Sequence, residues 1–285
     1  MSAECHEIQI LVLFLKMRFI IFFAFLAGAF ACNNPKNKAN NNNNASGYPV
    51  FVQDLLEEIE RFPDSTELRV QLIDTMDSLH LTKDAIQQID TLIAKDPGNY
   101  GNWFRKGELA LHNMDTTLAI KSFSNAASIY RSPDVLLTLA NLYAAQKNKI
   151  ALSLCTEVIA QKPDRSYIAH SYYVIGLYYG NSGSNDNAIE NFKKCLQQNY
   201  YYLDAYLEIG WIHFDQQKYA LAKEIFETAT AVKPTDARGH YWTAKCLEKL
   251  GQPDKAMNAY QLAFNLDNSL SEASAAISRI KASKN

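Results

Sequence analysis

Residues able to do chemistry are scattered through this sequence rather than grouped. None of its six histidines has a second ligand type at the H-E-x-x-H or C-x-x-C spacings that zinc sites use. The sequence also has no G-x-S-x-G nucleophile turn, no P-loop and no G-x-G-x-x-G phosphate-binding loop. We therefore expect no catalytic residue, metal site or cofactor, and hence no enzyme. The histidines are His6, His80, His112, His170, His213 and His240.

Three cysteines fall on the apolar faces of predicted helices, at Cys155, Cys195 and Cys246. A thiol at such a position acts as a small hydrophobic side chain, so we expect all three to be buried. A disulfide between Cys155 and Cys195 remains an alternative in an exported protein, although nothing in the spacing fixes its geometry.

The first 32 residues have the organisation of an export signal. Residues 19–31 (FIIFFAFLAGAFA) form an apolar segment that follows Lys16 and Arg18. At 13 residues, the segment is too short to cross a bilayer core of about 30 Å as a helix. We expect translation to begin at Met17, because an earlier start would place two glutamates and a second apolar run ahead of the basic residues.

Residues 29–32 (AFAC) resemble a loose bacterial lipobox, with Ala29 in place of the usual Leu. The resemblance implies cleavage before Cys32 and lipid modification of that cysteine, which would anchor the protein to a membrane. Asn33 replaces the Asp of enterobacterial inner-membrane lipoproteins, so the resemblance implies the outer membrane, facing the periplasm. Two alternatives remain open: a free cysteine after an ordinary cleavage site, and an uncleaved membrane span reaching back to Ile8.

Residues 33–47 (NNPKNKANNNNNASG) separate this signal from the rest of the chain. The segment is polar, mostly asparagine and free of aromatic residues, so it cannot bury enough apolar surface to order itself. We expect a disordered tether between the lipid anchor and a folded domain that covers residues 48–285.

Charge excludes one class of partner. The chain has 28 Lys and Arg against 30 Asp and Glu, and the two signs are mixed along the sequence. A nucleic-acid-binding protein concentrates basic residues on one face, so we expect no nucleic-acid partner.

The folded domain repeats itself with a period of 34 residues, most clearly in the units that begin at Ala169, Leu203 and Ala237. Each unit has a small residue near the middle of its first half, an alanine in its second half, and an aromatic residue four positions later. These residues resemble the tetratricopeptide repeat pattern. The aligned positions are Gly176, Gly210 and Ala244; Ala188, Ala222 and Ala256; and Phe192, Phe226 and Tyr260.

The resemblance implies an all-α fold, a right-handed superhelical α-solenoid of about six helix hairpins. A small residue on one helix lets the partner helix approach closely, while a large residue opposite fills the remaining space. We expect a leading helix at residues 49–62 and a capping helix at residues 271–283. The third hairpin is about one residue short in its turn, and the junction that follows, from Pro163 to Ala169, is about three residues longer than the period requires. The predicted hairpins cover residues 66–99, 100–132, 133–165, 169–202, 203–236 and 237–270.

In structures of the tetratricopeptide family, fixed positions of each first helix line a concave groove that binds peptides. Carried over to this sequence, the resemblance implies an unusually aromatic groove in hairpins four to six. A protein partner would explain these apolar residues, and burial within the domain itself is the alternative. The predicted partner-binding residues are Phe104, Leu137, Asn141, Tyr173, Leu177, Leu207, Trp211, Phe214, Tyr241 and Lys245.

Taken together, these patterns predict a non-catalytic protein-interaction scaffold tethered to the cell envelope. The groove lacks the basic residues with which chaperone-tail-binding relatives hold an acidic peptide, since Asp204 and Glu208 stand at two of those positions. Two alternatives remain: a structural homo-oligomer that uses the same aromatic face, and an accessory lipoprotein for secretin or β-barrel assembly. The second rests on architecture alone.

Overall fold

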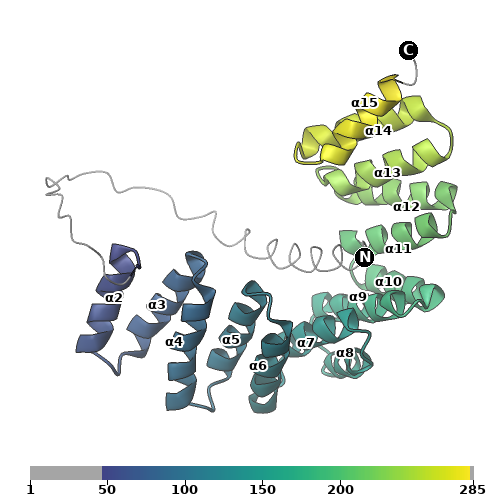
Figure 1. Ribbon diagram of the computed structural model, residues 1–285. Helices are drawn as coiled ribbons and strands as arrows, with labels where there is room; N and C mark the ends of the chain where they lie inside the picture. Colours follow the sequence, from purple (N-terminus) through teal and green to yellow (C-terminus); the bar gives the residue numbers. More distant parts are fainter. Residues whose placement is uncertain (1–46, 283–285) are drawn as a thin grey trace, which may run out of the picture. The chain divides into compact units, whose positions relative to one another are not determined.

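The computed structural model describes residues 47–282, which form fourteen α-helices and no strand within that range (Figure 1). The predicted signal, the lipidation site Cys32 and almost all of the predicted tether lie outside these residues. The helices are α2 (Val50–Arg61), α3 (Thr66–Ser78), α4 (Thr82–Lys95), α5 (Tyr100–His112), α6 (Thr116–Ile129), α7 (Pro133–Ala145), α8 (Ile150–Ala160), α9 (Arg165–Asn181), α10 (Asn185–Gln198), α11 (Leu203–Asp215), α12 (Tyr219–Val232), α13 (Ala237–Lys249), α14 (Pro253–Leu266) and α15 (Ser271–Ala282).

These helices pack as six consecutive hairpins, from α3–α4 to α13–α14, which we number one to six. The helix α2 packs on the first hairpin and α15 on the last, as Figure 1 shows. The α15 helix buries Ala273, Ala276, Ile277 and Ile280. The all-α solenoid with a leading and a capping helix is therefore confirmed.

Close approach of the two helices depends on glycine in half of the hairpins. In three hairpins a glycine of the first helix lies against a phenylalanine ring of the second, and a Cβ added there would stand 2.5 or 2.6 Å from the ring. All three rings are almost fully buried. Any larger residue would push the helices apart, as the small-opposite-large pattern predicts. The pairs are Gly107–Phe123, Gly176–Phe192 and Gly210–Phe226.

Each hairpin turn contains one residue in the left-handed region of backbone space. The amide of the next residue donates to a carbonyl five positions back, which closes the end of the first helix; Leu81 N to Met76 O, at 2.8 Å, is an example. Glycine adopts this conformation without steric cost, whereas other residues are strained by it. The residues are His80, Met114, Lys147, Gly183, Gln217 and Gly251.

The junction between hairpins three and four differs from the rest. The α9 helix has 17 residues and begins at Arg165, so the extra residues of the junction form an added helical turn. This longer helix packs on both α7 and α8. The N-terminus of α7 is capped by Ser132, whose hydroxyl accepts from Val135 N at 3.3 Å, with Pro133 in the first turn.

Candidate functional site

Three of the predicted groove residues are buried and offer no surface to a partner. Leu137 is 4% exposed, Tyr173 3% and Leu207 0%. The Tyr173 ring packs against Tyr202 and Phe192, with centroids 5.0 and 5.6 Å away. The expected surface role of these three residues is corrected: consecutive hairpins pack so closely here that the apolar side chains belong to the core.

The predicted groove aromatics of hairpins five and six, Trp211, Phe214 and Tyr241, are half-buried, and their rings lie around Trp242. Its ring centroid lies 5.3 Å from that of Phe214, 5.9 Å from Trp211 and 5.7 Å from Tyr241. It also stacks on the buried ring of Phe226 at 5.8 Å. Much of the aromatic side-chain surface is therefore covered within the domain, as the self-burial alternative expects.

Lys245 lies at the edge of this aromatic cluster, which we define as Trp211, Phe214, Tyr241 and Trp242. Its Nζ lies 5.1 Å from the Trp242 ring centroid and 5.6 Å from that of Tyr241. Contact of an ammonium group with ring faces is favourable, so Lys245 helps to cover the cluster while remaining half-exposed. Sequence reasoning did not select Trp242; its being one of only three tryptophans was the available signal.

The other predicted residues of hairpins two to four are also half-buried. Phe104 packs edge-on against Phe123 at 5.2 Å, and Leu177 packs at the side of the apolar core of hairpin four. Asn141 Nδ2 lies 3.0 Å from its own helix at Leu137 O and 2.9 Å from His170 Nε2 on α9. The Asn141 amide thus links neighbouring hairpins.

A set of charged groups lies between hairpins five and six. Arg238 donates to Asp204 and to Asp236, each at 2.9 Å. Burial, reinforced by the neighbouring Asp204 carboxylate, raises the pKa of Glu208 to about 8. Burial also raises the pKa of Asp204, although Arg238 opposes that shift. Glu208, one member of this pair of acidic residues, is therefore largely uncharged near neutral pH. The sequence alone did not indicate this.

A second set of charges joins hairpins one and two. Arg105 donates to Asp74 at 2.8 Å and to Asp77 at 3.1 Å, and His112 Nδ1 lies 2.9 Å from Asp77. The hydrogen bond to Asp77 raises the pKa of His112. Burial alone would raise the pKa of Asp77, but His112 and Arg105 hold it below its ordinary value.

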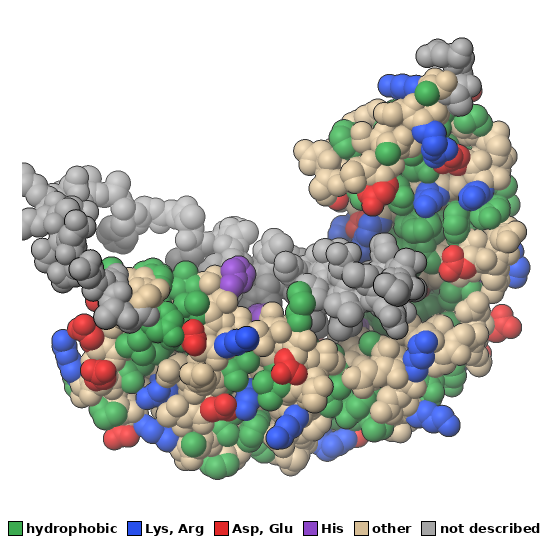
Figure 2. All heavy atoms as spheres, viewed as in Figure 1, with side chains coloured by type: hydrophobic (Ala, Val, Ile, Leu, Met, Phe, Trp, Pro, Cys, Tyr) green, Lys and Arg blue, Asp and Glu red, His purple; other side chains and the backbone are tan. Residues whose placement is uncertain are grey.

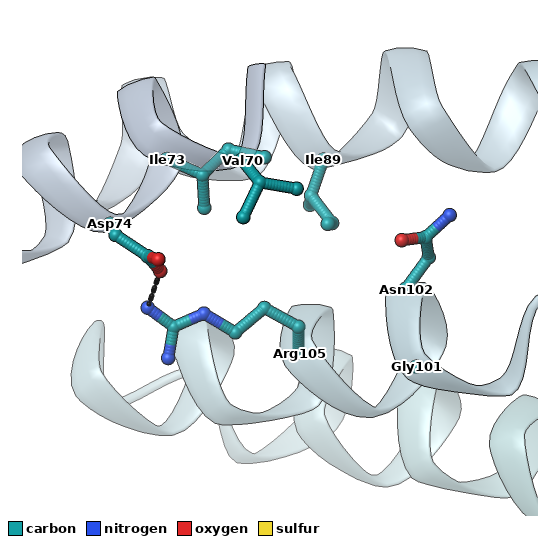
Figure 3. Close-up of a pocket in the computed structure, with 7 residues that line it drawn as sticks. All are labelled: Val70, Ile73, Asp74, Ile89, Gly101, Asn102 and Arg105. Atoms are coloured by element: carbon teal, nitrogen blue, oxygen red, sulfur yellow. Dashed lines mark hydrogen bonds and ion pairs between the residues drawn. The ribbon is translucent and has the colours of Figure 1, made fainter. Parts of the chain in front are cut away.

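Beside Arg105 the surface opens into a pocket of about 400 Å³ between α3, α4 and α5 (Figure 3). Apolar side chains of α3 and α4 form one wall, Asn102 and Arg105 of α5 lie opposite, and Asp74 of α3 meets Arg105 at one end, as the close-up shows. The lining residues are Val70, Ile73, Asp74, Ile89, Gly101, Asn102 and Arg105.

The predicted interior cysteines are confirmed as buried, and Cys155, Cys195 and Cys246 are all free thiols in this structure. Burial raises the pKa of each to about 12, so none is poised as a thiolate nucleophile. Within residues 47–282 no group of three or more His, Cys, Asp or Glu could hold a metal ion. No helix in that range has the length and apolarity to cross a membrane.

Comparison with known proteins supports the repeat assignment. Residues 169–200 and 207–268 match models described as tetratricopeptide repeat. No curated protein matches the sequence. Together with the hairpin packing described above, the matches identify the fold as a solenoid of tetratricopeptide type.

Several solved structures share the fold at low sequence identity. A tetratricopeptide repeat protein from Parabacteroides merdae is 12% identical with a TM-score of 0.62, and the match covers 81% of this chain and 91% of that one. PilF of Pseudomonas aeruginosa is 15% identical with a TM-score of 0.56, and the match covers 82% of this chain and 99% of that one. PilW, a type IV pilus biogenesis factor, is 16% identical with a TM-score of 0.59, and the match covers 72% of this chain and 94% of that one. At such identities the likeness concerns the fold alone.

Proposed function

We propose that this chain is a non-catalytic scaffold that binds a partner protein or peptide in the groove of hairpins four to six. Stacked hairpins present an extended surface of first-helix residues, which is how solenoids generally bind. The observation that carries the proposal is the half-exposed edge of the aromatic cluster with Lys245 beside it. Half-exposed Trp and Tyr side chains are enriched where proteins meet.

The proposal also places the protein at the cell envelope, in the outer membrane and facing the periplasm, through a lipid on Cys32. Its support is the sequence: a short apolar segment after basic residues, a lipobox-like ending and a polar tether. Cys32→Ala should move the protein from the membrane pellet to the soluble fraction, whereas wild type stays in the pellet. Persistence of the variant in the pellet would instead favour an uncleaved span.

Photo-crosslinking tests the groove without truncating a packed ring. A photoreactive phenylalanine at Lys245 of the full chain should yield a discrete cross-linked partner from cells. The matched control is Lys255, an exposed lysine on α14 outside the groove, which should yield none. Equal products from both positions would contradict the proposal.

The identity of the product separates the proposal from its alternatives. Cross-links between two copies of this chain, with light scattering that shows a dimer or larger oligomer, would favour the homo-oligomer. A secretin or β-barrel subunit, identified by mass spectrometry, would make the scaffold an assembly accessory. Any other single protein would support the scaffold in its general form.

A further inference from the structure

The pocket between α3, α4 and α5 combines an apolar wall with polar groups that face it. Val70, Ile73 and Ile89 form the apolar wall, and Val70 is 41% exposed although it is a large hydrophobic residue. In Figure 3 the Asn102 carboxamide faces the cavity from the opposite helix, where it offers a donor and an acceptor. A cavity of this size and composition suits an apolar side chain together with the peptide backbone that carries it.

The pocket exists because one repeat position lacks a side chain. In hairpins four and six the residues equivalent to Gly101 are His170 and Arg238, which reach back to Asn141 and Asp204 of the preceding hairpin. Gly101 makes no such bridge, so the space between the first helices of hairpins one and two stays open. Gly101 has an ordinary helical backbone, so local conformation alone does not demand glycine there.

The segment of the chain that carries the pocket is acidic. Residues 48–112 contain 12 Asp and Glu against 6 Lys and Arg, whereas residues 113–285 contain 16 against 18. At the pocket itself, Arg105 is shared by Asp74 and Asp77, and the Asp74 side chain is 61% exposed. Figure 2 shows acidic side chains beside an apolar patch over these N-terminal helices. The excess of carboxylates attracts cationic groups and repels anionic ones.

We infer that this pocket, which we call the acidic pocket, binds an aliphatic side chain of a partner segment whose neighbouring residues are lysine or arginine. The aliphatic group fills the space beside Val70, Ile73 and Ile89, and the cation lies against Asp74. The backbone of the segment pairs with the Asn102 carboxamide. The inference rests on the proposed scaffold function and adds a second contact for the partner, with hairpins three and four between it and the aromatic cluster.

The test pans a phage library of random 12-residue peptides on the immobilised full chain. Enriched peptides should place an aliphatic residue within a few positions of lysine or arginine. Gly101→Leu, which fills the cavity, should weaken the binding of the selected synthetic peptide at least tenfold, as measured by fluorescence anisotropy. Val70→Ser removes apolar wall without adding bulk and should weaken binding about fivefold, so the test survives if the leucine variant folds poorly.

Charge variants and matched controls complete the design. Asp74→Asn should weaken binding a few fold, and so should raising NaCl from 50 to 500 mM, because exposed charges are screened by salt. Leu221→Ser and Glu224→Gln make similar changes at exposed positions of α12 and should leave affinity within twofold of wild type. Enrichment of acidic peptides, or equal binding to wild type and both pocket variants, would overturn the inference.

The same assay distinguishes failure of the inference from failure of the proposed function. Peptides that lose binding with Tyr241→Ala/Lys245→Glu but not with the pocket variants would leave the scaffold function standing and remove the acidic pocket from it. Absence of any enriched peptide, together with no cross-linked product from position 245, would remove both.

Discussion

The two ends of the solenoid use the same repeat register to opposite effect. In hairpins five and six, Trp211, Phe214 and Tyr241 close over Trp242 and leave only an aromatic edge. In hairpins one and two, Gly101 leaves the equivalent space empty and the charges of Arg105 and Asp74 stand at its rim. One fold therefore offers a filled surface at one end and a cavity at the other, and side-chain size at a few groove positions decides which.

The largest expected effect tests whether Trp242 is the centre of the aromatic cluster. Trp242→Ala should lower the free energy of unfolding by about 3 kcal/mol, because four rings lose their common neighbour. Trp103→Ala in hairpin two should cost about half as much, since Trp103 lies at the side of its core. Urea denaturation followed by circular dichroism measures both, and equal losses would show that the two ends are packed alike.

Glu208 gives the second effect, a few kcal/mol at alkaline pH. Its pKa is about 8 in the fold and ordinarily 4.5, so the folded chain holds a proton in that interval that the unfolded chain releases. Its contribution is present below pH 4.5 and is lost as pH rises towards 8. Glu208→Gln should therefore unfold at higher urea than wild type at pH 9, with little difference at pH 4.5.

Glu108, a partly buried carboxyl in hairpin two, provides the comparison at the other end of the solenoid. Burial raises its pKa as well, but Arg105 lowers it, so Glu108→Gln should alter the pH dependence of stability less than Glu208→Gln. A larger response from Glu108 would reverse the contrast between the two ends.

The hairpin turns give a third effect, of about 1 kcal/mol or less. The first three hairpins place His80, Met114 and Lys147 in the left-handed conformation, whereas the fourth and sixth use Gly183 and Gly251. Met114→Gly should raise the free energy of unfolding, because Met114 is 69% exposed and loses strain without losing packing.

Gly251→Ala is the converse variant and should lower the free energy of unfolding by a similar amount. Thermal melts of both variants provide the measurement. A loss with Met114→Gly, or no change with Gly251→Ala, would mean that strain is absent from these turns.

The smallest effects concern two histidines and should have opposite signs. The hydrogen bond to Asp77 raises the pKa of His112 above 6.5, so its stabilising contribution is present below pH 6.5 and is lost as pH rises through the folded value. Burial lowers the pKa of His213 below 6.5, so its protonation destabilises the fold as pH falls below 6.5.

At pH 5.5, His112→Gln should therefore destabilise the chain and His213→Gln should stabilise it, each by less than about 1 kcal/mol because both groups are partly exposed. At pH 8.5 both differences should shrink. Urea titrations at the two pH values decide the matter, and shifts of the same sign would contradict the assigned environments.

The hairpins could be predicted from sequence because their packing is local and repeated. Gly176 and Phe192, for example, meet within one hairpin at a spacing that every similar unit shares. The long junction before Ala169 was also visible as a count of residues. The number of extra residues alone did not show that they would extend α9 by a turn, because a loop of the same length would fit the sequence equally well.

The groove could be predicted only in part, because exposure depends on distances between successive hairpins. Leu137, Tyr173 and Leu207 occupy groove positions by register, yet neighbouring helices enclose them. Trp242 lies one position beyond the expected groove positions and turns into the cluster only once hairpins five and six are packed. The acidic pocket arises because Gly101 has no side chain. Repeat patterns are defined by residues that recur, so they seldom draw attention to a position where a side chain is missing.

The principal packing of the folded domain runs from each helix to its close neighbours along the chain. Tension applied between α2 and α15 would therefore act on every interface between successive helices in series. Such a solenoid lengthens by small changes in packing at many helix interfaces. Under higher tension the weakest interface separates first while the other interfaces stay packed. A partner bound across several hairpins would stabilise the interfaces between them and make that part of the solenoid more rigid.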